Sequence, residues 1–288
     1  MTRYLTSIIG NSQKLDGGAM FGNIPKALWS KWIEPDAQNR IPLVCRALLI
    51  QEENRNILLE AGIGAFFSPA LKERFGIVEE HHVLLNSLHH AGLTHEDIDI
   101  VILSHLHFDH AGGLLSEWHA EKELSLLFPN ATYIVSSKAW ERANNPHMRD
   151  RASFIPELTQ LLKNSGRLMI QEDNTNDLLG PDYEFIYTEG HTPGMLHTII
   201  DMPEGPIIFA ADLIPGIPWL HSSTSMGYDR APEMLIDEKK SLLTFAIEKK
   251  CRLFYTHDTS IALSSIKYDD KKNFVATNLL SELHKIIS

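Results

Sequence analysis

The pattern of apolar residues divides the chain into two strand-rich halves. Apolar runs typical of buried strands recur in the first half, over residues 43–50, 56–62, 98–104 and 131–137. A second series of such runs occupies residues 183–190, 196–202, 206–212 and 252–258. Polar turns separate the runs, so each half predicts a sheet of its own.

The spacing of apolar residues between these strands predicts helices. Residues 81–92 have apolar side chains at helical spacing and end at Gly92, a residue suited to terminate a helix. Residues 232–250 begin with proline and acidic residues and end with lysines, as the helix dipole favours. Further helices are predicted over residues 65–75, from 111 to 118, in the polar stretch that runs to residue 165, and over 274–288.

The first 40 residues predict a loop-rich arm with four large apolar side chains, Met20, Phe21, Trp29 and Trp32. One interpretation is that the arm lines a cleft for an apolar substrate, together with Trp219 and Met226. The other is that it packs on the core or on a second copy of the chain, and an exposed aromatic arm would favour a homodimer.

The layout of strands and helices is typical of an α/β protein with two sheets. The simplest architecture packs the sheets face to face with helices on both outer surfaces, a four-layer αββα sandwich. No strong linker interrupts residues 1–288, so we expect a single domain.

Composition and charge exclude several classes of function. The chain has 26 lysine and arginine residues against 37 aspartate and glutamate residues, a net charge of −11. Such an acidic chain is poorly suited to bind DNA or RNA. No stretch reaches the ~18 apolar residues of a membrane span, so we expect no membrane contact and a cytoplasmic location. The two cysteines, Cys45 and Cys251, stand in apolar segments and predict buried thiols.

The strand predicted over 98–104 leads directly into a cluster of metal-type ligands: His105, His107, Asp109 and His110. Side chains two positions apart in an extended segment point the same way, so His105 and His107 can hold one ion. The chain then turns, and Asp109 and His110 project toward a second point. Imidazole and carboxylate ligands suit Zn²⁺ best, with Fe and Mn as alternatives. A histidine-rich surface loop explains the cluster less well, because such groups are costly to leave unpaired after a buried strand.

Three further candidate ligands follow predicted strands of the second half. His191 comes after 183–190, Asp212 ends 206–212, and His257 lies near the end of 252–258. Each of these residues alone is a weak signal. Together they can complete the two sites that the 105–110 segment begins.

The ordered series HLHFDHAGG, GHTPG, the aspartate of FAAD and the histidine of THD resembles the metallo-β-lactamase superfamily over residues 40–260. The N-terminal KLDGGAMFGNIPKALWSKW and the segment ADLIPGIPWLH are most similar to the branch of quorum-quenching lactonases and methyl parathion hydrolases. The resemblance implies the metallo-β-lactamase fold.

The resemblance also implies a ligand assignment for two divalent metal ions, most simply Zn²⁺. His105, His107 and His191 would hold the first ion, and Asp109, His110 and His257 the second. Asp212 would bridge both. A hydroxide between the ions would be the nucleophile, and Asp109 could pass a proton to the leaving group.

Two departures from the superfamily pattern concern groups around the metals. Glu60 stands where the superfamily usually has an aspartate that orients a ligand, and its longer side chain could serve the same purpose. Pro215 occupies the position of a substrate-binding tyrosine in some lactonases, so His221 and Tyr228 are candidate catalytic replacements. His197 is expected to be structural, and the histidines at 81, 82, 89, 90, 95, 119, 147 and 284 to lie on the surface or on helix faces.

The sequence thus predicts a metal-dependent hydrolase for a small-molecule ester or lactone, with an N-acyl homoserine lactone as the first candidate. The alternative on the same metals is an organophosphate or aryl-ester hydrolase. A hypothesis from a different class is a non-catalytic metal-binding or sensing protein. The scaffold alone cannot choose among substrates.

Overall fold

The computed structural model describes residues 2–287, and these form two compact units. The first unit comprises Met1–Gln13, Val44–Glu172 and Leu283–Ser288, and the second comprises Lys14–Leu43 and Asp173–Glu282. Both units are assembled from segments that are far apart in the sequence. The expectation of one domain over residues 1–288 stays a prediction.

The first unit is built on a sheet that has seven strands within the described residues. In spatial order they are β15 (Ile286–Ile287), β1 (Arg3–Ile9), β4 (Arg46–Glu52), β5 (Asn56–Leu59), β6 (Ile100–Ile102), β7 (Thr132–Ser136) and β8 (Leu168–Gln171). The strands from β5 to β8 run parallel to one another. The C-terminal ends of parallel strands share one edge of a sheet, and the loops that follow them meet there.

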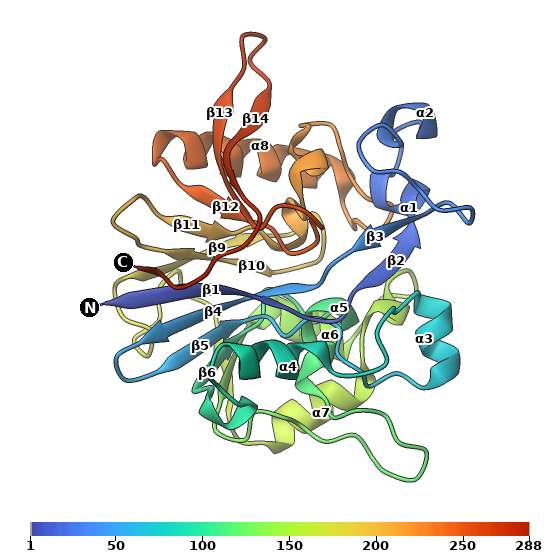
Figure 1. The fold of residues 1–288 in the computed structure, drawn as a ribbon, viewed down its shortest axis with the longest axis vertical. Coiled ribbons are helices and arrows are strands. Elements are labelled where there is room, and N and C mark those ends of the chain that lie inside the picture. The colour runs from blue at the N-terminus through green and yellow to red at the C-terminus, as the bar shows by residue number, and fades with distance from the viewer. Residues whose placement is uncertain (1, 288) are drawn as a thin grey trace. The chain divides into compact units, whose positions relative to one another are not determined.

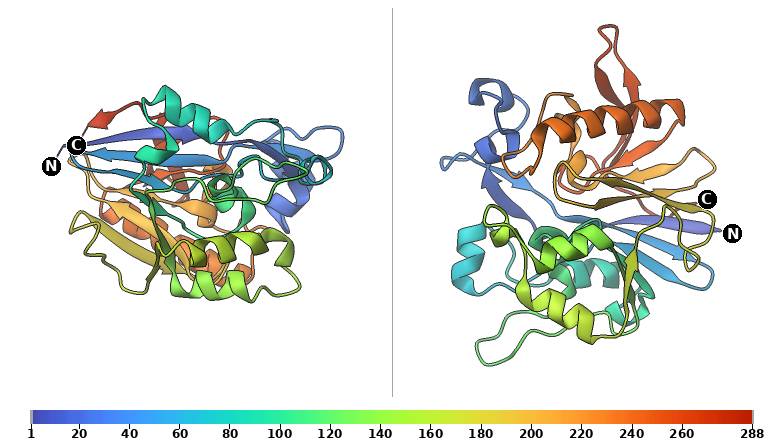
Figure 2. Two further views of the ribbon diagram at one scale, coloured as in Figure 1. Left: turned by 90° about the horizontal axis from the view of Figure 1, so that it is seen from below. Right: turned by 180° about the vertical axis from the view of Figure 1, so that it is seen from behind.

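Helices cover the sheet of the first unit with their apolar faces. Helix α4 (Val83–His90) packs against β1 with Leu84 and Leu88 buried, and Gly92 follows it with φ +85°, as a helix stop requires. Helix α6 (Ser137–Asn144) packs against β7, β8 and α7 (Pro156–Asn164), as Figure 2 shows. The short helices α3 (Pro69–Phe75) and α5 (Phe108–Ala111) lie in loops beside the strands.

The second unit has a sheet of six strands within the described residues. Their order is β14 (Phe274–Leu280), β13 (Leu263–Tyr268), β12 (Arg252–Phe254), β11 (Ile207–Phe209), β10 (Met195–Ile200) and β9 (Tyr183–Thr188). Neighbouring strands are antiparallel except β11 and β12, which are parallel. Helix α8 (Pro232–Glu248) packs against β13, and the β13–β14 hairpin projects beyond it in Figure 1.

The arm packs mainly into the second unit. It contains β2 (Gln13–Asp16), α1 (Gly17–Phe21), α2 (Lys26–Trp29) and β3 (Arg40–Leu43). Phe21 is stacked between Trp29, at a ring separation of 5.4 Å, and Trp219, at 4.8 Å. The indole nitrogen of Trp219 donates to the carbonyl of Met20. Because Met20, Phe21, Trp29, Trp219 and Met226 are all buried, they form core, and the expectation of an exposed aromatic arm is wrong except for Trp32.

Three expectations about elements are corrected. The helix expected over 274–288 is replaced by β14 and β15, because Phe274–Leu280 pairs with β13 and Ile286–Ile287 pairs with β1; residue 288 lies outside the described residues. The helix expected from residue 111 begins at Phe108 and gives way to a 3₁₀ turn over Gly112–Leu114. Within the arm that was expected to be rich in loops, Arg3–Ile9 form the paired strand β1. The polar stretch that runs to residue 165 contains two separate helices, α6 and α7, and the strand expected over 206–212 ends at Phe209 and leads into a 3₁₀ turn over Ala211–Leu213. The other predicted strands and helices are confirmed within a few residues at their ends.

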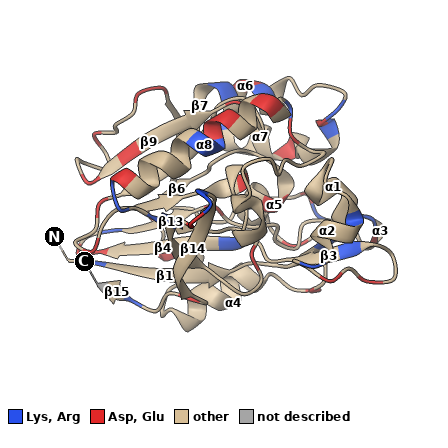
Figure 3. Ribbon diagram, turned by 90° about the horizontal axis from the view of Figure 1, so that it is seen from above, with Lys and Arg blue, Asp and Glu red and all other residues tan. Residues whose placement is uncertain are grey.

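Charged residues lie mostly on helices and loops, whereas most positions of the strands are uncharged (Figure 3). Cys45 and Cys251 are buried thiols, as predicted. Among the described residues, no helix combines the length and apolar character needed to span a membrane.

Candidate metal centre

The loop between β6 and α5 presents a buried histidine pair in the first unit. His105 is 0% exposed and His107 is 6% exposed. Nε2 of His105 lies 3.0 Å from Nδ1 of His107, so the two rings converge as the extended spacing predicts. The loop follows the end of a parallel strand, the edge of the sheet at which polar residues can gather.

Glu60 and His110 bring a carboxylate to the same loop. Glu60 follows β5, the neighbour of β6, and its Oε2 lies 2.9 Å from Nδ1 of the buried His110. Ser104 Oγ donates to the other carboxylate oxygen of Glu60 and lies 2.8 Å from Nδ1 of His105. Glu60, His105 and His110 each offer a ligand atom, and these atoms lie within 4.8 Å of one another. The longer side chain of Glu60 therefore reaches a histidine of the motif.

Asp109 is the more accessible acid of this loop. Its side chain is 12% exposed, and its Oδ1 lies 3.7 Å from Nε2 of His110. Its Oδ2 accepts a hydrogen bond of 2.7 Å from Nε2 of Gln13. The two oxygens of Asp109 thus face different neighbours.

A second cluster lies within the second unit, centred on Asp212. Oδ1 of Asp212 is 3.2 Å from Nε2 of His257, and Oδ2 is 3.3 Å from Nε2 of His191. All three side chains are buried. Asp212 follows β11 and His257 follows β12, and these neighbouring parallel strands deliver both residues to one edge of the sheet. The strand-end positions inferred from the sequence are therefore brought together in this unit.

Asp229 is a residue that the sequence analysis missed. Its Oδ1 lies 2.9 Å from Nδ1 of His191, and its Oδ2 accepts from the backbone N–H of Met226 at 2.6 Å. Asp229 is fully buried. It follows Tyr228 in an irregular segment, where no motif spacing marks it. A carboxylate on one ring nitrogen fixes the orientation of the imidazole and leaves the other nitrogen to serve as a ligand.

The turn that presents His191 depends on Gly190. A Cβ atom built on Gly190 would lie 2.5 Å from backbone atoms of Leu235, at the start of α8. Only glycine allows that approach. The backbone N–H groups of Glu189 and Gly190 also donate to the carboxylate of Glu238 on α8. Helix α8 therefore holds the turn in place.

The chemistry of both clusters fits a divalent metal. Buried imidazoles and carboxylates that converge at this spacing are the donor set that Zn²⁺ and similar ions take. In each unit a carboxylate, Glu60 or Asp229, contacts the Nδ1 atom of a histidine whose Nε2 faces an aspartate oxygen. That pattern is common around protein metal sites.

The remaining candidate histidines have different surroundings. His197 is buried, with Nε2 2.8 Å from Thr188 Oγ1, and burial lowers its pKa to about 4, which agrees with a structural role. His82 is a correction to the sequence analysis: it is buried rather than on the surface, its Nε2 lies 3.0 Å from the carbonyl of Gly113, and desolvation lowers its pKa.

His221 and Tyr228 are exposed residues of the second unit. The ring of His221 stacks on Trp32 at a centroid separation of 4.8 Å, and Tyr228 is 39% exposed. Their catalytic roles stay predictions.

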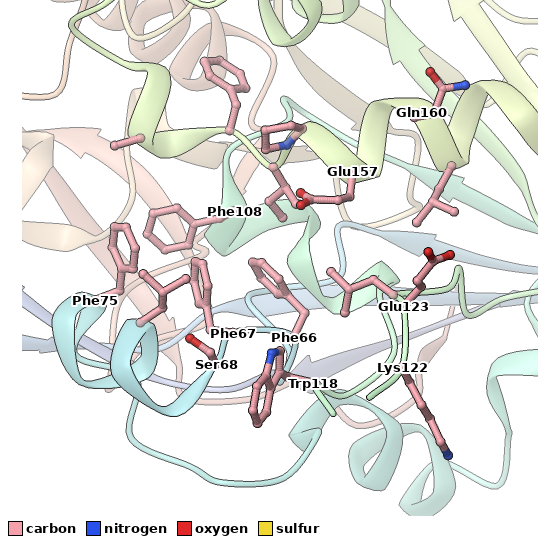
Figure 4. Close-up of a pocket in the computed structure, with 17 residues that line it drawn as sticks. Phe66, Phe67, Ser68, Phe75, Phe108, Trp118, Lys122, Glu123, Glu157 and Gln160 are labelled. Carbon is pink, nitrogen blue, oxygen red and sulfur yellow. The ribbon is translucent and has the colours of Figure 1, made fainter. Parts of the chain in front are cut away.

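An apolar cavity of about 810 Å³ adjoins the metal-ligand loop within the first unit. Phe66, Phe67, Phe75 and Phe108 gather at one side of it, and Lys122 and Gln160 stand at the other (Figure 4). Phe108 separates His107 from Asp109 in the chain. Phe154, also in the wall, packs edge-on against the ring of His107 at 4.9 Å.

The chain is similar in sequence and in structure to known metal-dependent hydrolases. The family model for the metallo-β-lactamase superfamily matches residues 40–274. A probable metal-dependent hydrolase from Staphylococcus aureus has a similar structure, with 27% identity, a TM-score of 0.84, and coverage of 96% of this chain and 98% of that one. AidC, a dizinc quorum-quenching lactonase, is 24% identical with a TM-score of 0.74, covering 96% and 94% of the two chains.

Sequence relatives carry the name N-acyl homoserine lactonase. One from Bacillus sp. is 25% identical over 181 residues, which are 62% of this chain and 63% of the relative, so under two thirds of that relative is spanned. One from Bacillus thuringiensis is 22% identical over 240 residues, or 78% of this chain and 85% of the relative.

Proposed function

Because this chain belongs to the metallo-β-lactamase superfamily, we propose that it is a binuclear hydrolase that opens a lactone or ester, with N-acyl homoserine lactones as its substrate class. The predicted metallo-β-lactamase fold is confirmed by that membership and by the likeness to the S. aureus structure. The chain is a metal-dependent hydrolase acting on ester bonds. The number of metal ions and the substrate are the parts that we propose.

The single observation that carries the binuclear proposal is the position of Asp212. Its two oxygens face two different imidazoles, His257 at 3.2 Å and His191 at 3.3 Å. A carboxylate that divides its oxygens in this way is suited to bridge two cations. We assign His105, His107 and His191 to one ion and Asp109, His110 and His257 to the other, with Zn²⁺ as the preferred metal.

The chain's own residues orient the ligands and manage protons. When bound, two such cations lower the pKa of a shared water and polarise the carbonyl of the ester. Glu60 and Asp229 hold the rings of His110 and His191 by their Nδ1 atoms, which directs Nε2 inward. Asp109, the more accessible acid, is the residue we propose to pass a proton to the leaving oxygen. No serine or cysteine nucleophile is required.

The cavity beside the ligand loop supports an apolar acyl group as part of the substrate. Its walls include Phe66, Phe67 and Trp118, and its volume of about 810 Å³ suits a small organic ligand. Of the two interpretations of the arm, packing on the core agrees with the burial of Met20, Phe21 and Trp29, so we place the apolar group of the substrate in this cavity instead of a cleft lined by the arm. We propose that the acyl chain lies here. Independently of the cavity, we propose His221 and Tyr228 as residues that bind the substrate.

An aryl-ester or organophosphate hydrolase is the alternative on the same metals. The aromatic walls of the cavity are compatible with it, since an aryl group can stack on Phe66 or Phe67 as readily as an alkyl chain can pack there. A non-catalytic metal-binding or sensing role is the alternative of a different class.

Metal analysis and a substrate panel test the proposal. We expect purified, zinc-loaded protein to hold two equivalents of metal and to hydrolyse acyl homoserine lactones with a higher kcat/KM than aryl esters or phosphotriesters. Preference for the phosphotriester would select the alternative substrate. Two bound equivalents without turnover of any ester would favour the sensing role, and a protein that never takes up two equivalents would refute the binuclear centre.

A homodimer also stays a prediction. Leu28, at 50% exposure, and Trp32, at 37%, are exposed apolar residues of the arm that would contribute to such an interface. Sedimentation of the purified protein would decide it.

A further inference from the structure

Gln13 is a buried amide that reaches the ligand loop from the N-terminal segment. It is 0% exposed, and its Nε2 donates to Oδ2 of Asp109 at 2.7 Å. The opposite amide orientation would place the carbonyl oxygen of Gln13 against the carboxylate, so the donor assignment follows from charge. With Oδ2 engaged, Asp109 turns Oδ1 toward Nε2 of His110, at 3.7 Å. One carboxylate oxygen of Asp109 thus contacts Gln13, and the other faces His110.

The backbone around Gln13 is held firmly by residues 77–83. Both the N–H and the hydroxyl of Ser12 donate to the carboxylate of Glu79 at 2.7 Å. Asn11 donates to the carbonyl of His81 at 2.6 Å and accepts from the N–H of Val83 at 3.0 Å. Gln13 itself forms a β-bridge with Ile77. The amide of Gln13 thus extends from a fixed backbone, as a residue that orients another must.

The same segment also contacts the other end of the ligand loop. Nε2 of His82 lies 3.0 Å from the carbonyl of Gly113, three residues beyond His110. Residues 77–83 therefore support both Gln13 and the chain after the ligands.

The amide oxygen of Gln13, unlike its amide nitrogen, makes no hydrogen bond with the described residues. This oxygen, Oε1, is buried. Burying an amide oxygen in this way costs stability. An apolar side chain of the same length would avoid that cost, so folding alone gives no reason for glutamine here. The contact with Asp109 gives one.

We propose that Gln13 is a positioning residue that holds Asp109 for the second metal ion. The inference rests on the proposed binuclear centre. It predicts that Gln13 affects metal affinity through Asp109 and makes no contact with substrate.

The test compares zinc affinities of the wild-type protein and Gln13→Met by competition with a chromophoric chelator. Methionine keeps the length of the side chain and removes the donor. We expect one of the two zinc equivalents to bind about 10- to 100-fold more weakly, the usual effect of losing a residue that orients a ligand. The melting temperature of the metal-free protein should not fall. Unchanged zinc affinity would overturn the proposal.

Gln51→Met is the matched control. Gln51 pairs with Asn56 at the start of β5, whereas the ligand loop follows the far ends of the parallel strands. This variant should bind both equivalents as the wild type does.

A double-mutant cycle separates positioning from a general structural role. In an Asp109→Ala background, Gln13→Met should cause no further loss of zinc affinity, because the residue through which it acts is gone. An additive loss would contradict the proposal. If Gln13→Met folds poorly without metal, Gln13→Asn serves in the same cycle, since it keeps the amide but is one methylene too short to reach.

Zinc binding by the wild-type protein distinguishes a failure of the binuclear centre from a failure of the role proposed for Gln13. Wild-type protein that fails to bind two equivalents refutes the binuclear centre. Wild-type protein that binds two while Gln13→Met is indistinguishable from it refutes only the role of Gln13.

Discussion

Oδ1 of Asp229 lies 2.9 Å from Nδ1 of His191, and the two side chains are 0% and 1% exposed. The contact joins the turn after β9 to the irregular segment before α8. Because the other ring nitrogen of His191 faces Asp212 at 3.3 Å, the imidazole is held between two carboxylates. The orientation of this ligand is therefore determined by a residue that belongs to no motif.

Removing the Asp229 carboxylate should weaken metal binding. We expect Asp229→Ala to lower zinc affinity by about 10- to 100-fold, because the ring of His191 loses the partner that fixes its direction. Asp229→Asn keeps an oxygen that can accept from Nδ1 and should lose less. Chelator competition measures both, and equal affinities for wild type and Asp229→Ala would contradict this role.

Zinc affinity should depend on the length of the side chain at position 60. The carboxylate of Glu60 contacts both Ser104 and His110 from a backbone with φ +64°. We expect Glu60→Ala to weaken zinc binding by about 10- to 100-fold. Glu60→Asp retains the charge but is shorter, so its affinity should fall between those of Glu60→Ala and the wild type. An affinity for Glu60→Asp at the wild-type level would show that the longer reach is not needed.

Asp212 should be needed for both metal ions. Since its two oxygens face separate histidines, Asp212→Ala removes a ligand from each ion in the proposed centre. We expect the variant to retain fewer than two zinc equivalents after dialysis and to lose on the order of 10²–10³ or more in kcat. Retention of both equivalents, measured by elemental analysis, would argue against a bridging role.

The cavity should select for the size of the apolar group. Trp118 forms part of its wall and is 39% exposed, so truncation should disturb the core little. We expect Trp118→Ala to reduce kcat/KM about tenfold for a long-chain acyl homoserine lactone while leaving a short-chain one nearly unchanged. Met148→Ala, at a side chain 85% exposed, is the control. An equal loss for both chain lengths would place the acyl group elsewhere.

His197 should make the free energy of unfolding of the metal-free protein decrease at acidic pH. Burial lowers the folded pKa of His197 from 6.5 to about 4, so the unfolded chain binds more protons between those two values. Stability should therefore fall as the pH drops from 6.5 to 4, by about 3 kcal/mol from this residue. Urea unfolding across that range should show a smaller decline for His197→Gln than for the wild type. His90→Gln, on the exposed end of α4, should follow the wild type.

Local sequence was sufficient for most of the elements and for the positions of the candidate ligands. The runs predicted over 98–104, 183–190, 206–212 and 252–258 end at or beside the candidate histidines and Asp212, because a sheet's strand ends are where polar groups can gather. The HLHFDH segment needs no distant contact to be recognised, since its spacing itself directs His105 and His107 to one side.

Tertiary structure alone decided which residues support those ligands. Gln13 and Asp109 are 96 positions apart, and Asp229 lies 38 positions from His191, so no periodicity along the chain links them. The same is true of the pairing that makes 274–280 a strand and of the stacking that buries Phe21 between Trp29 and Trp219. A pattern along the chain reports the local environment of each residue, whereas these contacts depend on which segments the fold places side by side.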